Sequence, residues 1–238
     1  MRKPILEALL KARAEKAATA LVSHLESGAQ TLIAGDRRIG DLPLTPALEA
    51  AISQVQRADR SRRVDSEAGP VFIQVFNPPL RLIIVGAVHI AQPLAPMAAL
   101  AGYDVTVIDP RRAFASDERF PSVSVRQDWP DDGLKALAPD ARTAIVALTH
   151  DPKLDDPALD VALRGDSFYI AALGSRKTHA ARLERLASLG HGAETLARIH
   201  GPAGLAIGAV SPAEIAVSVM AEMTAALRQA SPARIAAA

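Results

Sequence analysis

The chain contains no cysteine among its 238 residues, and only 3% of its residues are aromatic. The absence of cysteine excludes disulfide bonds, thiolate metal sites and a catalytic thiol in this chain, and it is typical of proteins in the reducing cytoplasm. Because 49% of the residues are hydrophobic, the core must consist mainly of Ala, Val, Leu and Ile. The composition therefore predicts a globular cytoplasmic protein whose chemistry does not depend on cysteine.

The chain also lacks an excess of either charge and a long uninterrupted apolar run. Its 27 basic and 26 acidic residues give a net charge of +1, which predicts neither a nucleic-acid partner nor binding to a membrane surface. The most apolar window, residues 82–103, is interrupted by His89, Gln92, Pro93 and Pro96, which argues against a membrane span. Charged residues between positions 11 and 16 likewise argue against a secretory signal.

Residues 1–78 predict a small N-terminal α+β domain. Apolar residues recur near helical spacing over 4–27, which predicts one helix ending before Gly28. A short strand is expected over 31–34, and Thr45-Pro46 has the pattern of a helix start, with the helix running to about 58. Residues 57–65 are strongly charged and are expected to be solvated, residues 71–76 predict a strand, and Asn77-Pro78-Pro79 predicts the domain boundary.

The sequence LIIVGAVHIAQPLAPMAALAGYDVTVID, from Leu82 to Asp109, predicts a strand, a tight turn, a helix and a second strand. Asp109 lies 23 positions after the turn residue Gly86, close to the spacing of about 20 residues in a dinucleotide-binding Rossmann unit. The fingerprint of that unit is G-x-G-x-x-G/A, but Val88 occupies the position of its second glycine. A β-branched side chain there would crowd a bound pyrophosphate, so the pattern favours the fold and disfavours NAD(P).

Beyond residue 80, apolar segments typical of strands alternate with segments typical of helices. Strands are predicted at 81–86, 104–109, 122–126, 143–149 and 167–173, and helices near 89–101, 131–138, 153–164, 176–189 and 212–228. This alternation predicts an α/β domain over residues 79–238 with a Rossmann-like doubly wound parallel sheet. Ligands of such sheets bind beyond the carboxyl ends of the strands, so the residues that follow each strand are candidates for a site.

Four of these strand ends carry residues suited to binding. Asp109 has the position of a ribose-binding acid, and Arg111 could hold a phosphate, although a solvated turn is the alternative. His89 fits either a ligand contact or a structural hydrogen bond. Thr149-His150-Asp151 offers an acid/base pair or a turn, and no neighbouring residue has metal-ligand spacing.

The last two candidate segments follow the predicted strand 167–173. Gly174-Ser175-Arg176-Lys177 opens a helix, where a capping serine, free N–H groups and basic side chains could face an anion. The segment 199–208 contains His200, Gly201 and Pro202 and is predicted to be a specified loop near a ligand, with a simple connector as the alternative.

These motifs together resemble the XdhC/CoxI family of accessory factors for xanthine dehydrogenase and related molybdoenzymes. The matching stretches are LRLIIVGAVHIAQ, GYDVTVIDPR, the Arg119-Phe120-Pro121 turn, LTHDPKLD, YIAALGSRKTHAARLERL and RIHGPAGLAIGAVSPAEIAVSVMAE, within residues 80–226. Two departures stand out: Val88 replaces the second glycine of the family's G-A-G-H loop, and residues 1–78 lack its glycine-rich, cysteine-containing segment. Any sulfur must therefore come from a partner.

The resemblance implies a cytoplasmic, non-catalytic maturation factor that binds molybdenum cofactor and helps its sulfuration and its insertion into a xanthine dehydrogenase-type enzyme. The implied partners are the large subunit of the apo-molybdoenzyme and a cysteine desulfurase. The final helix can pack in its own core or across a homodimer, and the sequence leaves both open. The candidate cofactor-binding residues are Gly86, Ala87, Val88, His89, Asp109, Arg111, Thr149, His150, Gly174, Ser175, Arg176, Lys177, His200, Gly201 and Pro202.

Two other functions remain open from the sequence. The first is an NAD(P)-dependent oxidoreductase that uses a proton donor such as His150 or His200. The second is a nucleotide-binding module without chemistry of its own.

Overall fold

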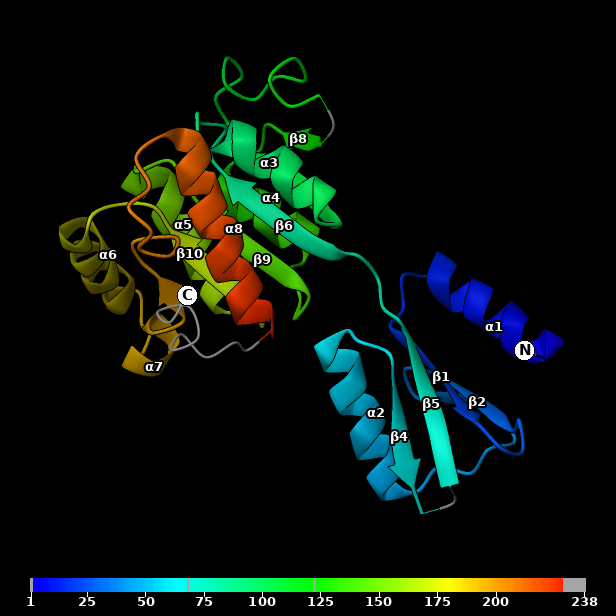
Figure 1. The fold of residues 1–238 in the computed structure, drawn as a ribbon. Helices are drawn as coiled ribbons and strands as arrows, with labels where there is room; N and C mark the ends of the chain where they lie inside the picture. Colours follow the sequence, from blue (N-terminus) through cyan, green and yellow to red (C-terminus); the bar gives the residue numbers. More distant parts are fainter. Residues whose placement is uncertain (1, 68, 122, 229–238) are drawn as a thin grey trace. The chain divides into compact units, whose positions relative to one another are not determined.

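The structure is a computed structural model that describes residues 2–67, 69–121 and 123–228. The chain divides between Pro78 and Pro79 into two compact units, each with its own sheet (Figure 1). The last ten residues of the predicted second domain and the first residue of the predicted strand 122–126 lie outside the described residues.

The first unit is a five-stranded antiparallel sheet in the order β3-β2-β1-β5-β4. Its elements are α1 (Lys3–Ala14), β1 (Thr19–His24), β2 (Gln30–Ala34), β3 (Arg37–Gly40), α2 (Pro46–Ala58), β4 (Arg62–Ser66) and β5 (Gly69–Phe76). One core cluster joins α1 to the sheet through Leu9 and Leu32, and another joins α2 through Ile52 and Ile73. The predicted α+β character of this region is confirmed.

The prediction of a single helix over 4–27 is wrong beyond Ala14. Lys16 adopts a left-handed conformation with φ of 52°, and Thr19–His24 forms the central strand β1. This strand is buried at nearly every position, so it lacks the alternating pattern of a half-buried strand. Its Leu21 falls by coincidence at helical spacing from the apolar residues of α1. Gly28 belongs to the turn between β1 and β2.

Other sequence predictions for this unit agree with the structure in part. The Thr45 hydroxyl accepts a hydrogen bond from the Leu48 N–H at 3.3 Å, which confirms the predicted start of α2. Residues 57–65 are mostly exposed, as expected, but Arg62–Ser66 forms the edge strand β4. Charged edge strands protect a sheet from pairing with other chains, and their polar composition hides them from a pattern search.

The second unit is a six-stranded parallel sheet in the order β11-β10-β9-β6-β7-β8. Its strands are β6 (Leu80–Val85), β7 (Tyr103–Ile108), β8 (Ser124–Arg126), β9 (Thr143–Ala147), β10 (Tyr169–Ala172) and β11 (Ile199–His200). Counted from β6, this is the Rossmann order 3-2-1-4-5-6, and the direction of winding reverses between β6 and β9. The predicted Rossmann-like sheet is confirmed.

Helices cover both faces of this sheet (Figure 1). They are α3 (Ala91–Leu100), α4 (Pro130–Leu137), α5 (Pro152–Leu163), α6 (Arg176–Ser188), α7 (Ala193–Leu196) and α8 (Pro212–Arg228). Leu82 and Ile84 of β6 join the core beneath α3 and α8, whereas Ile83 and Val85 join the core beneath α4, α5 and α6. No helix in the described ranges is long and apolar enough to cross a membrane.

The sequence missed two short elements of this unit, β11 and α7. The predicted loop over 199–208 begins with the two-residue strand β11, which pairs with β10 at the edge of the sheet. Two residues are too few to produce a period in the sequence, so only pairing with a neighbour reveals such a strand. The other predicted strands and helices of this unit are confirmed, with ends that differ by a few residues.

Helix α3 provides a test of the core because it carries both a buried and an exposed leucine. Leu94 is fully buried in the core beneath α3, whereas Leu100 on the same helix is 91% exposed. We expect Leu94→Ala to lower the free energy of unfolding by about 2–5 kcal/mol and Leu100→Ala to change it by less than about 0.5 kcal/mol. Urea denaturation of both variants would measure the difference, and equal losses would contradict the described packing of α3.

Candidate functional site

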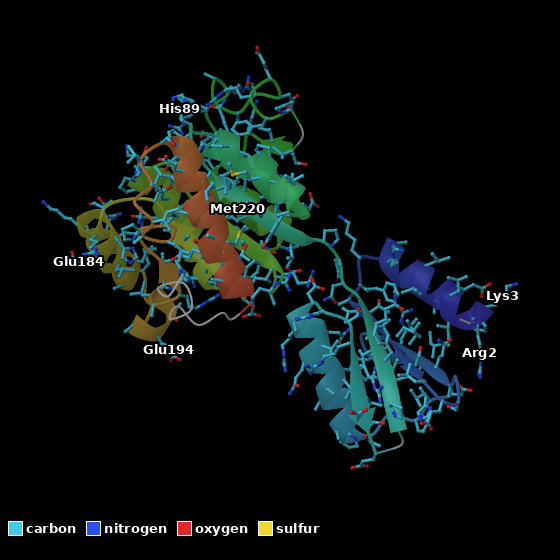
Figure 2. All side chains as sticks on the ribbon, in the orientation of Figure 1. Arg2, Lys3, His89, Glu184, Glu194 and Met220 are labelled. Atoms are coloured by element: carbon cyan, nitrogen blue, oxygen red, sulfur yellow. The ribbon has the colours of Figure 1, made fainter. Side chains whose placement is uncertain are left out.

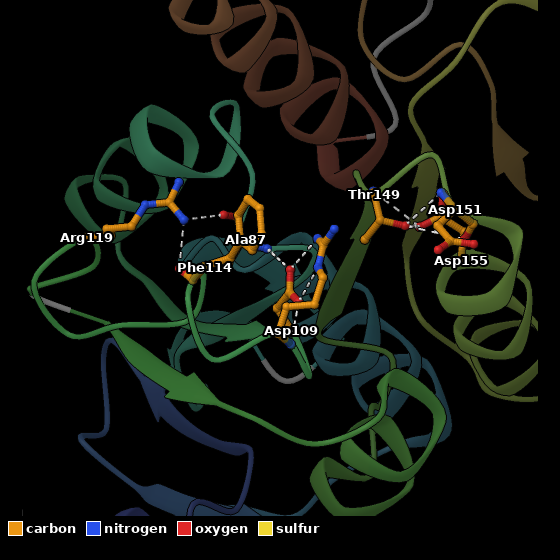
Figure 3. A network of polar contacts seen from close by, with 8 residues as sticks. Ala87, Asp109, Phe114, Arg119, Thr149, Asp151 and Asp155 are labelled. Atoms are coloured by element: carbon orange, nitrogen blue, oxygen red, sulfur yellow. Dashed lines mark hydrogen bonds and ion pairs between the residues drawn. The ribbon is translucent and has the colours of Figure 1, made fainter.

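The predicted site residues lie in the loops at one edge of the parallel sheet. Parallel strands place all their carboxyl ends at the same edge, so the segments after β6, β7, β9, β10 and β11 form one rim. The residues predicted from sequence follow these five strands in the order given above, from Gly86 to Pro202. Figure 3 shows two of the polar clusters in these loops, one around Asp109 and one around Thr149.

Gly86 allows the loops after β6 and β9 to approach each other closely. Its φ is 109°, and a Cβ at this position would lie 2.6 Å from Thr149 Cγ2. Its N–H donates to the Ile108 carbonyl at 2.8 Å. Both the backbone conformation and the lack of space therefore require glycine here.

Helix α3 does not begin directly after the glycine turn. The helix starts at Ala91, two residues after the predicted start, because residues 88–90 form a separate bend in which the Ala91 N–H donates to the Val88 carbonyl. Val88 is partly buried and packs against the core beneath α3. His89 is exposed at the rim (Figure 2).

Asp109 is fully buried, and both of its oxygens are occupied by protein donors. Oδ2 accepts from the Ala87 N–H at 2.8 Å and from Arg111 Nη2 at 2.7 Å. Oδ1 accepts from the Arg111 N–H and from Arg111 Nε, both at 2.9 Å. The structure thus pairs Asp109 with Arg111, for which the sequence predicts separate contacts with a ribose and a phosphate, and it leaves no free acceptor for a ribose hydroxyl.

These bonds also set the ionisation of Asp109. Burial raises the pKa of its carboxyl group, but the hydrogen bonds from Arg111 and Ala87 outweigh burial and hold the pKa below the ordinary aspartate value. The carboxylate is therefore ionised at neutral pH.

Arg119 fixes the loop after β7 to the turn after β6. Its Nη1 donates to the Ala87 carbonyl at 2.9 Å and to the Phe114 carbonyl at 2.8 Å (Figure 3). The Arg111 guanidinium lies 4.5 Å from the centre of the Phe114 ring, within the range of a cation–π contact. The sequence showed Arg119 only as part of the Arg119-Phe120-Pro121 turn of the family resemblance, and no spacing rule indicated its contact with Ala87.

A pocket of about 260 Å³ lies beside this arginine, between α3 and the segment that leads to β8. It is lined by Gln92, Ala95, Pro96, Arg119, Phe120, Pro121 and Val123. Apart from Arg119 and Gln92 its lining is apolar.

The loop after β9 is held by Asp155 of α5. Thr149 donates through its hydroxyl to Asp155 Oδ1 at 2.6 Å, and the Asp151 N–H donates to the Thr149 hydroxyl at 3.1 Å (Figure 3). The Asp151 carboxylate caps α5 by accepting from the Lys153 N–H. His150 is exposed with a left-handed φ of 61°, and no hydrogen bond joins it to Asp151 in the described structure. The arrangement favours the turn over the acid/base pair.

A buried ion pair lies beneath the loops after β9 and β10. Arg182 of α6 and Asp155 are 2% and 1% exposed, and Arg182 Nη2 lies 3.6 Å from Asp155 Oδ2. Burial raises the pKa of Asp155 more than the Thr149 hydroxyl and the Arg182 charge lower it. Arg182 Nη2 also donates to the Leu173 carbonyl at 2.9 Å, so the pair connects α5 and α6 to the end of β10.

The segment Gly174-Ser175-Arg176-Lys177 forms the start of α6, as predicted. The Ser175 hydroxyl caps the helix by accepting from the Thr178 N–H at 3.1 Å. The backbone N–H groups of Arg176 and Lys177 occupy the first helical turn, where no intrahelical acceptor exists. Both side chains are exposed, so basic side chains and the positive end of the helix dipole lie together at the rim.

The loop after β11 packs against α6 and the end of β10. A Cβ on Gly201 would overlap the His179 ring, and the Ala203 N–H donates to the Ala172 carbonyl at 3.1 Å. His200 Nδ1 lies 3.2 Å from Glu222 Oε1 of α8. Glu222 was not among the residues predicted from sequence, because its contact with His200 depends on how α8 crosses the sheet.

No group of three or more His, Cys, Asp or Glu residues within the described ranges has an arrangement suited to a metal ion. What the rim offers instead is hydrogen-bond donors and cations. These groups suit an anionic ligand.

Gly86 and Gly102 allow the close contact after β6 to be tested. Both have positive φ values, 109° and 90°, but only Gly86 lacks space for a Cβ. We expect Gly102→Ala to lose about 1–2 kcal/mol of stability through backbone strain and Gly86→Ala to lose about 3 kcal/mol or more through strain and overlap together. Equal shifts of the two urea midpoints would contradict the close approach of Thr149.

Asp109 should make stability depend on pH. A carboxylate whose pKa is lower in the folded state stabilises the protein above the unfolded value of about 4, and this contribution is lost as the pH falls through the folded value. We expect Asp109→Asn to destabilise the protein by about 2 kcal/mol or more at pH 7, with a smaller difference from the parent below pH 4. Asp104→Asn, an exposed position on the same strand, serves as the control and should show little effect at either pH.

Comparisons with known proteins agree with this fold. Residues 82–223 match the XdhC Rossmann domain family. Over 94% of its length the chain resembles a crystal structure described as a xanthine dehydrogenase from Bacillus halodurans, with a TM-score of 0.74 and 22% identity, and it covers 66% of that chain. At this identity the likeness concerns the fold alone.

Three curated proteins are similar in sequence. The chain is 34% identical over 148 residues to the molybdenum cofactor insertion chaperone PaoD of Escherichia coli, and 35% identical over 153 residues to the uncharacterized protein YqeB of the same species. It is 31% identical over 211 residues to a probable xanthine dehydrogenase subunit of Bacillus subtilis. The alignment with PaoD includes 62% of this chain and 40% of the relative, and the alignment with YqeB includes 64% and 28%. The alignment with the Bacillus subtilis subunit includes 87% of this chain and 60% of the relative.

The resemblance predicted from sequence is confirmed by the family match over residues 82–223. The chain belongs to the XdhC family.

Proposed function

We propose that this chain binds molybdenum cofactor as cargo and helps its sulfuration and its insertion into a xanthine dehydrogenase-type enzyme. The proposal is supported by membership of the XdhC family and by 34% identity to the insertion chaperone PaoD. One structural observation carries it: the rim has exposed cations and free N–H groups at the start of α6, while Asp109 has no free oxygen. The site thus retains a place for a phosphate and lacks the ribose acceptor of a dinucleotide-binding domain.

In this proposal the cargo phosphate binds at the start of α6. The N–H groups and side chains of Arg176 and Lys177 donate to the phosphate, where the helix dipole adds to their charge. The remaining predicted residues, in the loops after β6, β9 and β11, line the place of the pterin. Asp109, Arg111 and Asp155 take supporting roles, because their charged groups are bound to other protein atoms.

The source of sulfur and the recipient of the cofactor are separate parts of the proposal. The chain has no cysteine and therefore no side chain that can carry a persulfide, so a cysteine desulfurase would supply the sulfur. The large subunit of an apo-molybdoenzyme would receive the cofactor. The chain spans 28–60% of the length of the curated relatives it matches.

The alternative of an NAD(P)-dependent oxidoreductase has one observation in its favour, the Rossmann strand order with a glycine turn after the first strand. Two others oppose it. Both Asp109 oxygens accept hydrogen bonds from the protein, and Val88 packs at the position of the second glycine. A nucleotide-binding module without chemistry would face the same lack of a ribose acceptor.

Retention of the cofactor tests the proposal. The parent protein, purified from a host that makes molybdenum cofactor and then oxidised, should release a fluorescent pterin in near-stoichiometric amount. We expect the double variant Arg176→Ala, Lys177→Ala to retain about tenfold less or lower, because it loses charge-assisted hydrogen bonds to the phosphate.

The control is the double variant Lys135→Ala, Arg164→Ala, which removes the same charge. Lys135 lies in the last turn of α4 and Arg164 caps the carboxyl end of α5, which places both far from the rim of strand ends. This variant should retain pterin like the parent. A folded parent without pterin, together with an increase in melting temperature on addition of NAD, would replace the proposal with the nucleotide-binding alternative.

A further inference from the structure

Glu222 of α8 accepts two hydrogen bonds and contacts a histidine, and these three partners come from separate parts of the second unit. Its Oε2 accepts from the Tyr169 hydroxyl at 2.5 Å and from the Gly204 N–H at 2.8 Å, and its Oε1 lies 3.2 Å from His200 Nδ1. Tyr169 begins β10, His200 ends β11, and Gly204 lies in the loop that follows. The carboxylate therefore joins α8 to two neighbouring strands and to the loop at the rim.

We propose that His200 is the proton acceptor of the cargo site and that Glu222 and Tyr169 are the residues that position it. This inference rests on the proposed function for the identity of the ligand. The ligand group that it requires is an acidic N–H, O–H or S–H, carried by the same molecule as the phosphate.

The ionisation of Glu222 determines which ring nitrogen of His200 carries a proton. Burial raises the pKa of Glu222, but the hydrogen bonds from His200, Tyr169 and Gly204 outweigh it, so the pKa lies below the ordinary glutamate value. Burial and the nearby Glu222 charge raise the pKa of Tyr169, which therefore stays a phenol and a donor. An ionised carboxylate only accepts, so the His200 nitrogen that faces it must carry a proton.

A proton on Nδ1 leaves Nε2 of neutral His200 with a free lone pair. The partner of one ring nitrogen commonly fixes the tautomer of a histidine in this way. His200 Nε2 has no hydrogen-bond partner in the described part of the chain. It is also not one of the buried polar atoms that lack a partner, so it is exposed to solvent. The side chain is 37% exposed, so this nitrogen is accessible to a ligand.

His200 and the proposed phosphate site follow two adjacent strands of the sheet. His200 ends β11, and α6 follows the adjacent strand β10, so the two groups belong to strands about 4.8 Å apart. The Tyr169 ring supports the imidazole, with 4.7 Å between the ring centres. One ligand could thus contact both the start of α6 and His200.

The proposed step transfers one proton from the ligand to His200 Nε2. The ligand X–H bond breaks as the Nε2–H bond forms, which produces X⁻ and an imidazolium that the Glu222 carboxylate stabilises across Nδ1–H. Tyr169 and Gly204 keep the carboxylate in place, and no oxidant or second reactant is required.

Nitrogen NMR of the full chain labelled with ¹⁵N-histidine tests the tautomer without any ligand. The His200 signals are assigned by their loss in His200→Gln. At pH 8 we expect Nδ1 to be protonated and Nε2 to be unprotonated in the parent and in Tyr169→Phe, which retains the carboxylate. In Glu222→Leu the Nε2–H tautomer should appear, and an Nε2–H tautomer in the parent would overturn the inference.

Pterin retention in folded variants supplies the second readout. We expect His200→Phe, which can still stack on Tyr169, to retain about tenfold less pterin than the parent, as for the loss of one hydrogen bond to a polar group. His200→Gln should retain more than His200→Phe because its amide oxygen can still accept. Retention by His200→Phe equal to that of the parent would overturn the inference and leave the proposed function intact, whereas a parent without pterin would contradict the proposed function.

Discussion

The buried Asp109 carboxylate connects the end of β7 to the turn after β6, and the geometry of this side of the site depends on that connection. Its oxygens take the Ala87 N–H and three donors of Arg111. Arg119 adds a second connection by donating to the Ala87 carbonyl. In dinucleotide-binding domains an acidic residue at this position binds a ribose hydroxyl. Here Asp109 holds the two loops together instead, because hydrogen bonds from Ala87 and Arg111 occupy all of its accepting positions.

The other side of the site is organised by buried charge in a comparable way. Asp155 orders the loop after β9 through Thr149, and Arg182 reaches the end of β10 through the Leu173 carbonyl. Burying two charges is costly and adds little net stability. The benefit is a defined position for the loops after β9 and β10. The loop after β9 borders the topological switch between β6 and β9, where ligands of such sheets bind.

Much of the fold could be predicted from the sequence, since short apolar strands alternating with helices leave few options other than a parallel doubly wound sheet. The positions of Gly86, Ser175 and Thr45 were also readable, because turns and helix caps depend on a few adjacent residues. The prediction of a helix over 4–27 is wrong because the buried central strand β1 has no alternation of apolar and polar residues. Strand β11 was not predicted because two residues are too few to show a periodic pattern. Both elements depend on pairing with distant strands.

The sequence by itself determined which residues reach the rim, since each lies directly after a strand and parallel strands end together. Only the tertiary structure decided what those residues can do. Asp109 loses its free oxygens to Arg111 and Ala87, and His200 gains an oriented ring from Glu222, which lies 22 positions further along the chain. The physical reason is that hydrogen bonds and burial set the charge and availability of a polar group, and both arise from segments that meet only in the folded chain.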